Sequence, residues 1–235
     1  MKFIRRAALL VMLAGIGAGV ALRAQDQRPS GSTGTPRPVH MERRFDNPER
    51  SAKSFDNPAR DAWQMPGRVI ETLGLQRGQT VADIGAGTGY FAIRLAKSPE
   101  APTVYALDIE PSMIDYVTRR AAAENLKNVT AVLTPAEKAN LPEPVDLVLI
   151  VNTYHHIPNR VAYFRDLRRS MKALARLAII DYRPGAAGAA IPAEFQFTPD
   201  QVAAEVRQAG FRLIAQPDFL PRQQFLVFQI EEGPR

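Results

Sequence analysis

Residues 80–97 read TVADIGAGTGYFAIRLAK, and this stretch decides the fold. A short apolar run leads into GAGTG at 85–89, and a segment of helical composition follows. A glycine-rich turn between a strand and a helix is the setting of a cofactor-binding loop. Glycines carry no Cβ, so the backbone can approach a ligand closely. The stretch therefore predicts a cofactor site at the carboxyl end of a buried strand.

A second glycine pattern, GIGAG at 15–19, lies in a different setting. It belongs to an uncharged run from 7 to 22, which follows a basic start and ends in small residues near Ala24. This order of charge, apolar core and small-residue exit predicts a signal peptide over 1–24, and therefore an exported or periplasmic protein. The run is shorter than the roughly 20 residues of a spanning helix. The alternative is an uncleaved leader that anchors the protein to the membrane.

Charge and cysteine content exclude several classes of function. The formal net charge is +6, but removal of the leader after Ala24 would leave +2, because the leader carries four basic residues and no acid. The rest of the chain has no long basic block, so we expect no nucleic-acid partner. The chain has no cysteine, which excludes disulfides and cysteine-based chemistry. His40 is remote in sequence from the other two histidines, and we expect no metal site.

Two segments separate the leader from the main domain. Residues 25–43 are rich in Pro, Gly, Ser and Thr, and such a segment predicts a flexible tether because it has little apolar surface to bury. Residues 44–65 contain FDNP twice, and Asn before Pro favours helix starts near Pro48 and Pro58. We predict a helical arm at 44–65. It either packs on the domain or forms a lid with 63–64 at its tip.

Apolar strands and helices alternate over residues 66–235, the predicted main domain. Strands rich in Val, Ile and Leu that alternate with helices indicate a mostly parallel sheet. The last two strands are too close in sequence for a crossover helix, so they predict an antiparallel hairpin. The predicted strands are 80–85, 103–109, 129–134, 145–152, 176–183, 211–217 and 223–230, and the predicted helices include 159–174. The fold class is α/β, a Rossmann-like doubly wound sheet of seven strands.

The class of cofactor follows from the spacing around the turn. Asp83 precedes Gly85, Gly87 and Gly89 in the pattern D-x-G-x-G-x-G. A dinucleotide fingerprint, G-x-G-x-x-G, would place its third glycine at Tyr90. The observed spacing instead resembles motif I of class I S-adenosylmethionine (SAM)-dependent methyltransferases.

This resemblance extends over residues 60–230. LPEPVDLVLIVNTYHHI at 141–157 is similar to the family's fourth-strand motif, and RLAIIDYR at 176–183 looks like its fifth strand. The likeness is to the broad group that includes ubiquinone and menaquinone biosynthesis enzymes, and an exported bacterial subgroup shares the FDNP and YHHI stretches. The resemblance implies SAM as cofactor, with contacts from Asp83, Gly85, Ala86, Gly87, Gly89, Asp108, Ile109, Ala136, Glu137 and Asn152.

Individual roles and departures follow from the same resemblance. Asp108 ends the second strand, where an acidic residue can accept hydrogen bonds from both ribose hydroxyls in methyltransferases and in NAD enzymes alike. Asn152 takes the place that faces the methyl donor. Pro135 and Ala136 replace the family's Asp-Ala pair, so Glu137 or a backbone group must substitute at the adenine. Residues 173–175 replace the family's usual Pro-Gly-Gly turn before the fifth strand.

Two residues after the fourth strand are the candidates for catalysis. Methyl transfer requires donor and acceptor to be held close and aligned, and it needs a base only when the acceptor carries a proton. His155 is our first candidate for that base, because neutral histidine suits proton removal near pH 7. Tyr154 is the second, as a wall or hydrogen-bond donor. Asp181 and Arg183 follow the fifth strand on the same side, where Arg183 could hold an acidic substrate.

The sequence therefore predicts a SAM-dependent methyltransferase that acts on a small or lipid-like molecule. A non-catalytic SAM-binding protein is the first alternative, and an NAD-type oxidoreductase is the second. Membrane contact is expected only through an uncleaved leader. The sequence identifies neither the acceptor molecule nor the oligomeric state.

Overall fold

The computed structural model describes residues 45–186, 188 and 191–231. Contacts divide the chain into Met1–Arg37 and Pro38–Arg235, and all described residues belong to the second unit. The predicted signal peptide (1–24) and the predicted tether (25–43) therefore lie outside the described residues. Among those that are described, no helix combines the length and apolar character needed to cross a membrane.

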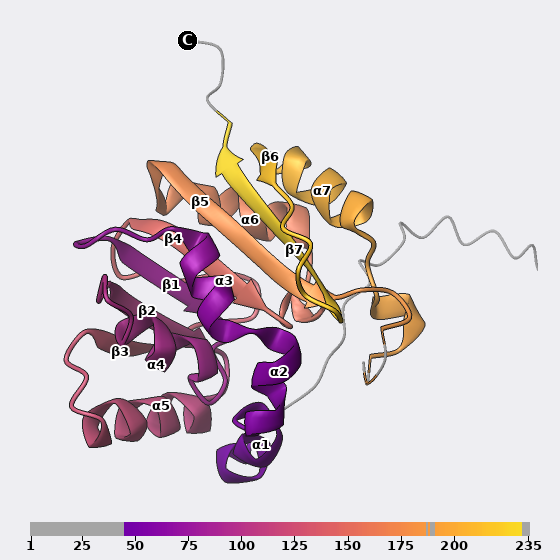
Figure 1. Ribbon diagram of the computed structural model, residues 1–235. Helices are drawn as coiled ribbons and strands as arrows, with labels where there is room; N and C mark the ends of the chain where they lie inside the picture. Colours follow the sequence, from indigo (N-terminus) through magenta and orange to yellow (C-terminus); the bar gives the residue numbers. More distant parts are fainter. Residues whose placement is uncertain (1–44, 187, 189–190, 232–235) are drawn as a thin grey trace, which may run out of the picture. The chain divides into compact units, whose positions relative to one another are not determined.

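The described residues form a seven-stranded sheet in the order β3-β2-β1-β4-β5-β7-β6 (Figure 1). Strands β3 through β5 in this order run parallel, and β7 pairs antiparallel with both β5 and β6. The strands are β1 Thr80–Ile84, β2 Thr103–Asp108, β3 Val129–Leu133, β4 Val145–Val151, β5 Met171–Tyr182, β6 Phe211–Ala215 and β7 Gln223–Ile230. The predicted mostly parallel sheet with its C-terminal antiparallel hairpin is confirmed.

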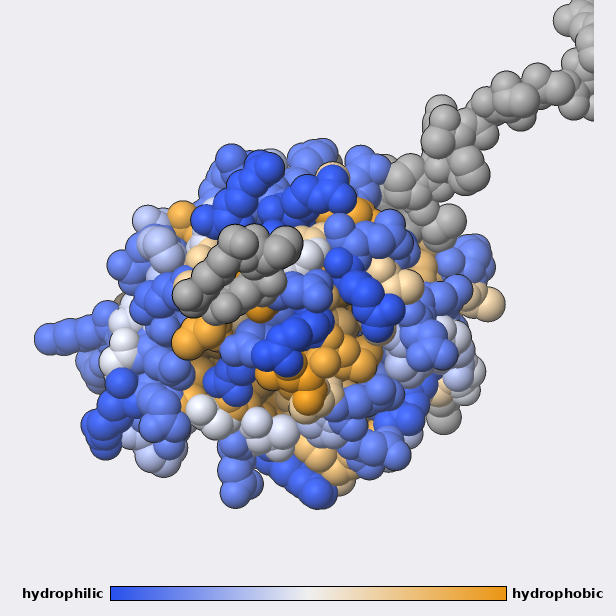
Figure 2. Space-filling view, turned by 90° about the horizontal axis from the view of Figure 1, so that it is seen from above, coloured by the Kyte–Doolittle hydropathy of each residue, from blue (hydrophilic) through white to orange (hydrophobic). Residues whose placement is uncertain are grey.

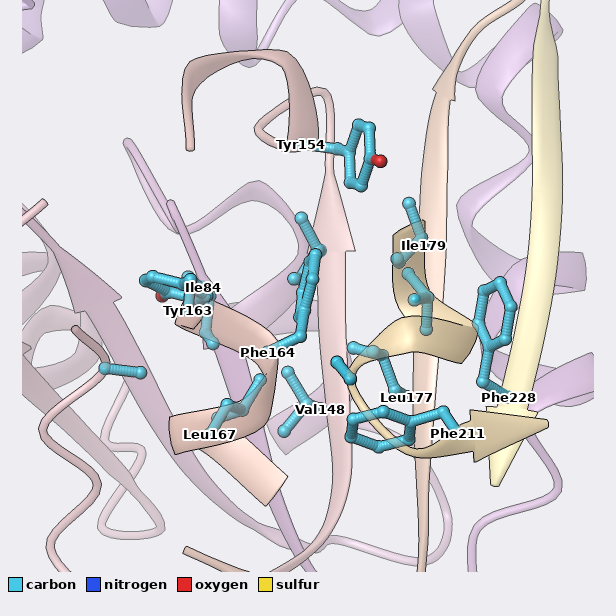
Figure 3. Close-up of a cluster of buried hydrophobic side chains, with 14 of the residues drawn as sticks. Ile84, Val148, Tyr154, Tyr163, Phe164, Leu167, Leu177, Ile179, Phe211 and Phe228 are labelled. Carbon is cyan, nitrogen blue, oxygen red and sulfur yellow. The ribbon is translucent and has the colours of Figure 1, made fainter. Parts of the chain in front are cut away.

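Helices cover both faces of the sheet, which explains why β1 and β4 are buried along almost their whole length. One core contains side chains of α6 and α7, including Phe164 and Leu167, and Figure 3 shows them against Val148 and Leu177 of the sheet. The opposite core contains side chains of α3, α4 and α5. These helices are α3 Pro66–Leu73, α4 Tyr90–Ala96, α5 Pro111–Ala123, α6 Arg160–Arg169 and α7 Pro199–Gln208.

The predicted arm is helical and irregular. Helix α1 (Pro48–Phe55) begins as expected, with the Asn47 side chain accepting a hydrogen bond from the backbone N–H of Arg50 at 2.8 Å. The second FDNP begins only a 3-10 turn, η1 (Pro58–Arg60), which leads into the short helix α2 (Asp61–Gln64). Figure 1 shows α1 and α2 near the end of the sheet where β5 finishes. The arm is thus folded beside the edge at which ligands bind in parallel sheets.

The sequence prediction was wrong about the end of α6. The expected helix over 159–174 ends at Arg169, and β5 already begins at Met171. Met171 pairs with Val145, but the next pair joins Leu147 to Arg176, so residues 172–175 form a bulge in β5. Leu174 in this bulge is 69% exposed. On the face seen in Figure 2, apolar residues gather in one area among polar ones.

Candidate donor and acceptor site

The glycine loop after β1 requires residues without side chains. Gly85 has φ 72°, and a Cβ there would overlap the side chain of Thr153 from the segment after β4. Gly87 has φ 54°, and its Cβ would come within 3.3 Å of the Phe55 ring. Both positions combine the left-handed conformation that favours glycine with crowded surroundings. Glycine is therefore required at these two positions by the turn itself and by the packing of Thr153 and Phe55 against the loop.

Asp108 at the end of β2 holds this loop. Its Oδ2 accepts the backbone N–H of Gly87 at 2.8 Å, and its Oδ1 accepts the N–H of Glu110 at 3.0 Å. Burial raises the pKa of the Asp108 carboxyl, against the effect of these backbone hydrogen bonds. A carboxylate has about four acceptor positions, so further donors can still bind. Asp108 thus fixes the loop and keeps acceptor capacity for hydroxyl groups of a ligand.

Asp83 at the end of β1 is only 3% exposed, and its Oδ2 has no hydrogen-bond partner within the described residues. Burial first, and then the nearby charge of Asp108, raise the pKa of Asp83 to about 7. The backbone N–H of Ala92 and the positive charge of Arg60 act in the opposite direction. An unpartnered buried acceptor is costly and calls for an explanation. A positively charged ligand group would provide one.

Exposed apolar residues lie beside Asp108. Ile109, directly after β2, is 48% exposed, and Leu133, which pairs with Asp108 across β2 and β3, is 53% exposed. Ala136 and Glu137 form the turn after β3. This turn is held near Asp108 by Thr134, whose N–H donates to the Asp108 carbonyl at 3.0 Å. The predicted adenine-contacting positions thus come together around an apolar surface suited to a flat base.

Asn152 follows β4 in the left-handed conformation, with φ 54°. Its Oδ1 accepts a hydrogen bond from Nε2 of Gln223 at 2.7 Å, and its N–H donates to the carbonyl of Ile180. Gln223 begins β7 and is fully buried. Gln223 could not be predicted from the sequence, because only the sheet order places β7 beside β5 and within reach of the end of β4.

His155 is held by a carboxylate. Its Nδ1 lies 3.0 and 2.8 Å from the two carboxylate oxygens of Asp181 at the end of β5, and its backbone N–H donates to the same carboxylate at 3.3 Å. The side chain is 3% exposed, and its ring lies 4.3 Å from that of His156. Asp181 and His155 were each expected on the ligand side of the sheet. Their pairing fixes the imidazole and is decided by tertiary structure.

Tyr154 lies in the core and not on the ligand side, contrary to its expected role as a wall of the substrate site. Figure 3 shows it among the same side chains as Phe164 and Ile179, and it is fully buried. Its hydroxyl donates to Oε2 of Glu205 at 2.5 Å. Burial and the charge of Glu205 raise the pKa of Tyr154 well above its usual value. A hydroxyl engaged in this way is not available to a substrate.

Arg183, the residue suggested for an acidic substrate, also has partners of its own. Its Nε donates to the carbonyl of Gln223 at 2.8 Å, and its guanidinium pairs with Asp218. These contacts join the end of β5 to the segment before β7.

The arm lies directly on the glycine loop. Besides the approach of Phe55 to Gly87, Nη1 of Arg120 on α5 bonds to both Asp56 of the arm at 2.9 Å and the carbonyl of Thr88 at 3.0 Å. At the other end of the arm, the centroid of the Trp63 ring lies 5.8 Å from that of Tyr182, the last residue of β5. The arm therefore spans from the loop after β1 to the end of β5.

The comparisons with known proteins agree with this geometry. Residues 75–218 match the family described as "Methyltransferase domain", which covers more than half of the chain. The chain belongs to this methyltransferase-domain family. A "SAM dependent methyltransferase from Aquifex aeolicus" has a solved structure that is 28% identical, with a TM-score of 0.73 over 80% of this chain and 100% of that one. The Rossmann-like methyltransferase fold and the expected family are confirmed.

Two curated relatives match part of the chain. A "Demethylmenaquinone methyltransferase" of Tropheryma whipplei is 28% identical over 110 residues, 47% of this chain and 44% of that protein. A "27-O-demethylrifamycin SV methyltransferase" of Amycolatopsis mediterranei is 30% identical over 132 residues, 54% of this chain and 48% of that protein. The chain thus spans about half the length of the relatives it matches. The expected likeness to menaquinone-biosynthesis methyltransferases is confirmed.

The fold alone does not determine the reaction. The "[4+2]-Cyclase SpnF" has a TM-score of 0.63 at 15% identity, which shows a shared fold and nothing more. Activity must therefore be argued from the residues of the site.

Proposed function

We propose that this protein transfers a methyl group from SAM to a small or lipid-like acceptor. The observation that carries the proposal is the glycine loop held by Asp108, with Gly85 and Gly87 in conformations and surroundings that admit no side chain. SAM would supply a methyl group already activated by the positive charge on its sulfur. The protein's part is to hold donor and acceptor close, aligned and away from water.

The residues present fit the parts of SAM. Asp108 retains acceptor capacity for the ribose hydroxyls, and the exposed side chains of Ile109 and Leu133 offer apolar surface for the adenine. Ala136 and Glu137 adjoin the same surface. Asp83 offers an unpartnered carboxylate oxygen to a positively charged group.

His155 is the residue we assign to proton removal. Hydrogen bonding of Nδ1 to Asp181 keeps the proton on Nδ1, which leaves Nε2 as the basic nitrogen. If the acceptor carries an O–H or N–H, Nε2 takes that proton as the acceptor attacks the methyl carbon. Asp181 is then a positioning residue that fixes the tautomer and the orientation of the ring.

Binding of the donor is the first test. Calorimetry with the mature protein should show SAM and S-adenosylhomocysteine (SAH) binding, and Asp108→Ala should weaken both at least tenfold, since the loop loses its anchor. An intact protein that binds neither would end the proposal. A protein that binds NADH instead would favour an oxidoreductase. Binding without turnover on any fraction of cell extract would favour a non-catalytic SAM-binding protein.

The acceptor can be found with labelled SAM. Methyl-labelled SAM is incubated with extracts of source cells, and the molecule that gains label is identified. Two relatives are named as methyltransferases of demethylmenaquinone and of 27-O-demethylrifamycin SV, and these names support a small organic acceptor. With the acceptor in hand, His155→Gln should lower kcat about 100-fold and leave SAM affinity unchanged. Asp181→Asn should lower kcat and alter its pH profile, which a merely structural role would not do.

Export is the second part of the proposal. It is supported by the pattern of residues 1–24: a basic start, an uncharged core and a small-residue exit. Fractionation of cells that express a C-terminally tagged chain should recover a shortened protein in the periplasm. A full-length protein in the membrane fraction would mean that the leader is retained as an anchor. A full-length cytoplasmic protein would contradict export.

A further inference from the structure

Asn152 lies beside the glycine loop, directly after β4. Thr153, the next residue, occupies the space that a Cβ of Gly85 would need, so this segment packs against the loop. The backbone N–H of Asn152 donates to the carbonyl of Ile180 on β5 at 2.8 Å. Asn152 is therefore fixed between the loop and a neighbouring strand, at the edge of the sheet where ligands bind.

Gln223 determines which end of the Asn152 side-chain amide is free. Its Nε2 donates to Oδ1 of Asn152 at 2.7 Å, although the two residues are 71 positions apart. Gln223 is 0% exposed, and its own carbonyl accepts a hydrogen bond from Nε of Arg183 at 2.8 Å. Within the described residues no acceptor bonds to Nδ2 of Asn152, and the half-buried side chain leaves this nitrogen accessible. The amide thus has its oxygen toward β7 and its N–H groups free.

This contact leaves another group of the protein unsatisfied. Oε1 of Gln223 is buried and has no hydrogen-bond partner within the described residues. Buried polar atoms without partners are few in native proteins, and each one calls for an explanation. The Gln223 amide gives its donor end to Asn152 although its acceptor end stays unpaired. Orientation of Asn152 explains such an arrangement.

Aromatic side chains adjoin the two amides. Tyr182 is directly opposite Gln223 in the pairing of β5 with β7, so the two side chains lie on the same face of the sheet. The centroid of the Trp63 ring lies 5.8 Å from that of Tyr182. Rings beside a few oriented polar groups are typical of sites for flat organic molecules.

We propose that Gln223 is a positioning residue that makes Asn152 a hydrogen-bond donor to an oxygen atom of the methyl acceptor. This inference rests on the proposed function and deepens it by naming the acceptor class: a phenol or an enol, whose hydroxyl becomes an oxyanion. An oxyanion has lone pairs for both the attack and the hydrogen bond. An amine is disfavoured, because its single lone pair attacks the methyl carbon and its N–H groups meet the N–H groups of Asn152.

The hydrogen bond acts while the acceptor loses its proton. The proton passes from the acceptor O–H to Nε2 of His155, and negative charge develops on the oxygen. The N–H of Asn152 stabilises that charge, as a donor aimed at a developing oxyanion does. An electron pair of the oxygen, or of the carbon conjugated with it, forms the new bond to the methyl carbon. The electron pair of the broken C–S bond stays on sulfur, which loses its positive charge.

Two variants reverse the group that faces the acceptor. Asn152→Asp has nearly the same shape and keeps an oxygen for Nε2 of Gln223, but it replaces the N–H groups with a carboxylate oxygen. Gln223→Glu accepts from Nδ2 of Asn152 and therefore turns the amide oxygen toward the acceptor. Asn125→Asp is the matched control, because Asn125 is exposed and has the same left-handed backbone, with φ 55° against 54° for Asn152.

Each protein is assayed for methyl transfer from labelled SAM to an extract of source cells, and for SAH affinity by calorimetry. Asn152→Asp and Gln223→Glu should each lower the rate of label transfer about 100-fold, because the oxyanion then meets an oxygen atom. SAH affinity, which also reports folding, should change less than about threefold, and Asn125→Asp should match wild type in both measurements.

The pH profile separates recognition from a merely structural role. Lowering the pH from about 8 to about 6 should raise the rate of Asn152→Asp relative to wild type, since a protonated carboxyl can donate a hydrogen bond to the acceptor oxygen. The same ratio for Asn125→Asp should stay constant.

The labelled product gives the final readout. NMR should locate the methyl group on an oxygen, or on a carbon next to one that carries oxygen. A methyl group on an amine nitrogen, or full transfer by Asn152→Asp, overturns this inference while the methyltransferase assignment stands. Loss of SAH affinity in Asn152→Asp shows a structural role for the amide and also overturns it. A wild-type protein that binds no SAH, or labels nothing, overturns the proposed function as well.

Discussion

Two polar clusters, each built around an arginine, differ in how completely their hydrogen-bonding groups are satisfied; Arg160 is buried and Arg60 is half-buried. Arg160 on α6 pairs with Glu205 on α7, with Nη2 to Oε1 at 3.0 Å and Nε to Oε2 at 2.5 Å, and Tyr154 donates to the same carboxylate. The guanidinium also lies 4.2 Å from the centroid of the Phe197 ring. Around Arg60, in contrast, the acceptors are neutral, and Gln64 and Asp83 each keep an unpartnered atom.

The difference teaches how to tell a structural cluster from a ligand site. A buried charge is tolerated when its partners are inside the protein, and then the cluster ties elements together. The Arg160 cluster does this for η2 (Tyr154–His156), α6 and α7. A buried polar group with incomplete partners costs stability until a ligand completes the set. On this argument the Arg160 cluster should govern folding and the Arg60 cluster should govern binding.

The largest expected effect is on folding, from Glu205→Gln. It leaves the Arg160 cation without its carboxylate, and we expect a loss of about 3 kcal/mol in the free energy of unfolding. SAH affinity of the folded protein should not change. Urea denaturation and calorimetry measure the two quantities, with exposed Asp200→Asn on the same helix as control. A loss of SAH affinity without loss of stability would reverse the comparison.

The pH dependence of the same cluster gives a second readout. Burial acts to raise the pKa of Glu205, but hydrogen bonds from Arg160 and Tyr154 prevail and lower it. A lowered folded pKa means stability that is present above the unfolded value, near 4.5, and lost as pH falls through the folded value. Wild type should lose this contribution on acidification, and Glu205→Gln should not.

The next largest effect is a gain in stability, from Asp83→Asn. The pKa of Asp83 is raised from 3.8 to about 7, so the folded state binds more protons than the unfolded state between these values. Stability of wild type should therefore fall as pH rises from about 4 to about 7. Asp83→Asn should remove this fall, gain about 2 kcal/mol at pH 8 and weaken SAH.

The measurement is urea denaturation from pH 5 to 8 without ligand. The groups acting on the Asp83 carboxyl are Asp108, Arg60 and the backbone N–H of Ala92. Asp115→Asn, an exposed change on α5, is the control. If Asp83→Asn is less stable than wild type at every pH, the Asp83 carboxylate stabilises the fold as the groups around Arg160 do. The proposed difference between the two clusters is then wrong.

A smaller effect is expected from Tyr154→Phe. It removes the hydroxyl that donates to Glu205 but leaves the Arg160–Glu205 pair, so stability should fall by about 1 kcal/mol. SAH affinity and turnover of the folded protein should match wild type. Denaturation and steady-state kinetics at a temperature where both proteins are folded provide the test. A turnover defect in a stable variant would restore Tyr154 to the substrate site.

The smallest effect is expected from Asn47→Ala. It removes the cap of α1, which should loosen the arm by about 1 kcal/mol locally and leave global unfolding unchanged. Because Phe55 of the arm packs on the glycine loop at Gly87, SAH affinity should fall about twofold when the arm loses order. Amide exchange over residues 50–55 reports the arm, and exchange in β4 serves as the internal control. Equal protection in both proteins would show that the cap does not order the arm.

Most residues of the candidate cofactor site could be proposed from the sequence because their signals are local. Asp83 and the loop glycines are adjacent in the chain, and their strand–turn–helix setting follows from the composition on either side. Asp108 was found because parallel strands end at one edge of a sheet. The bulge in β5 and the end of α6 at Arg169 were missed, since the register of neighbouring strands decides them.

The partners in the site depend on positions far apart in the chain. Asp181 lies 26 residues after His155, and the sequence placed both on the ligand side without joining them. Both Tyr154 and His155 were expected to act on the substrate. In the 3-10 turn that contains them, however, the Tyr154 side chain bonds to Glu205 and the His155 side chain bonds to Asp181. No periodicity in the sequence separates such neighbours.

What the sequence determined by itself is the α/β order of elements and the turn that only glycine can form, because both depend on residues close together in the chain. What only the tertiary structure decided is which of two arginines in the same motif is partly covered by the domain. Arg50 and Arg60 follow the same FDNP, yet Arg50 faces solvent and the guanidinium of Arg60 lies on the Tyr90 ring. The physical reason is that burial and electrostatic surroundings depend on segments that are far apart in the chain and meet only in the folded protein. A local motif cannot specify those segments.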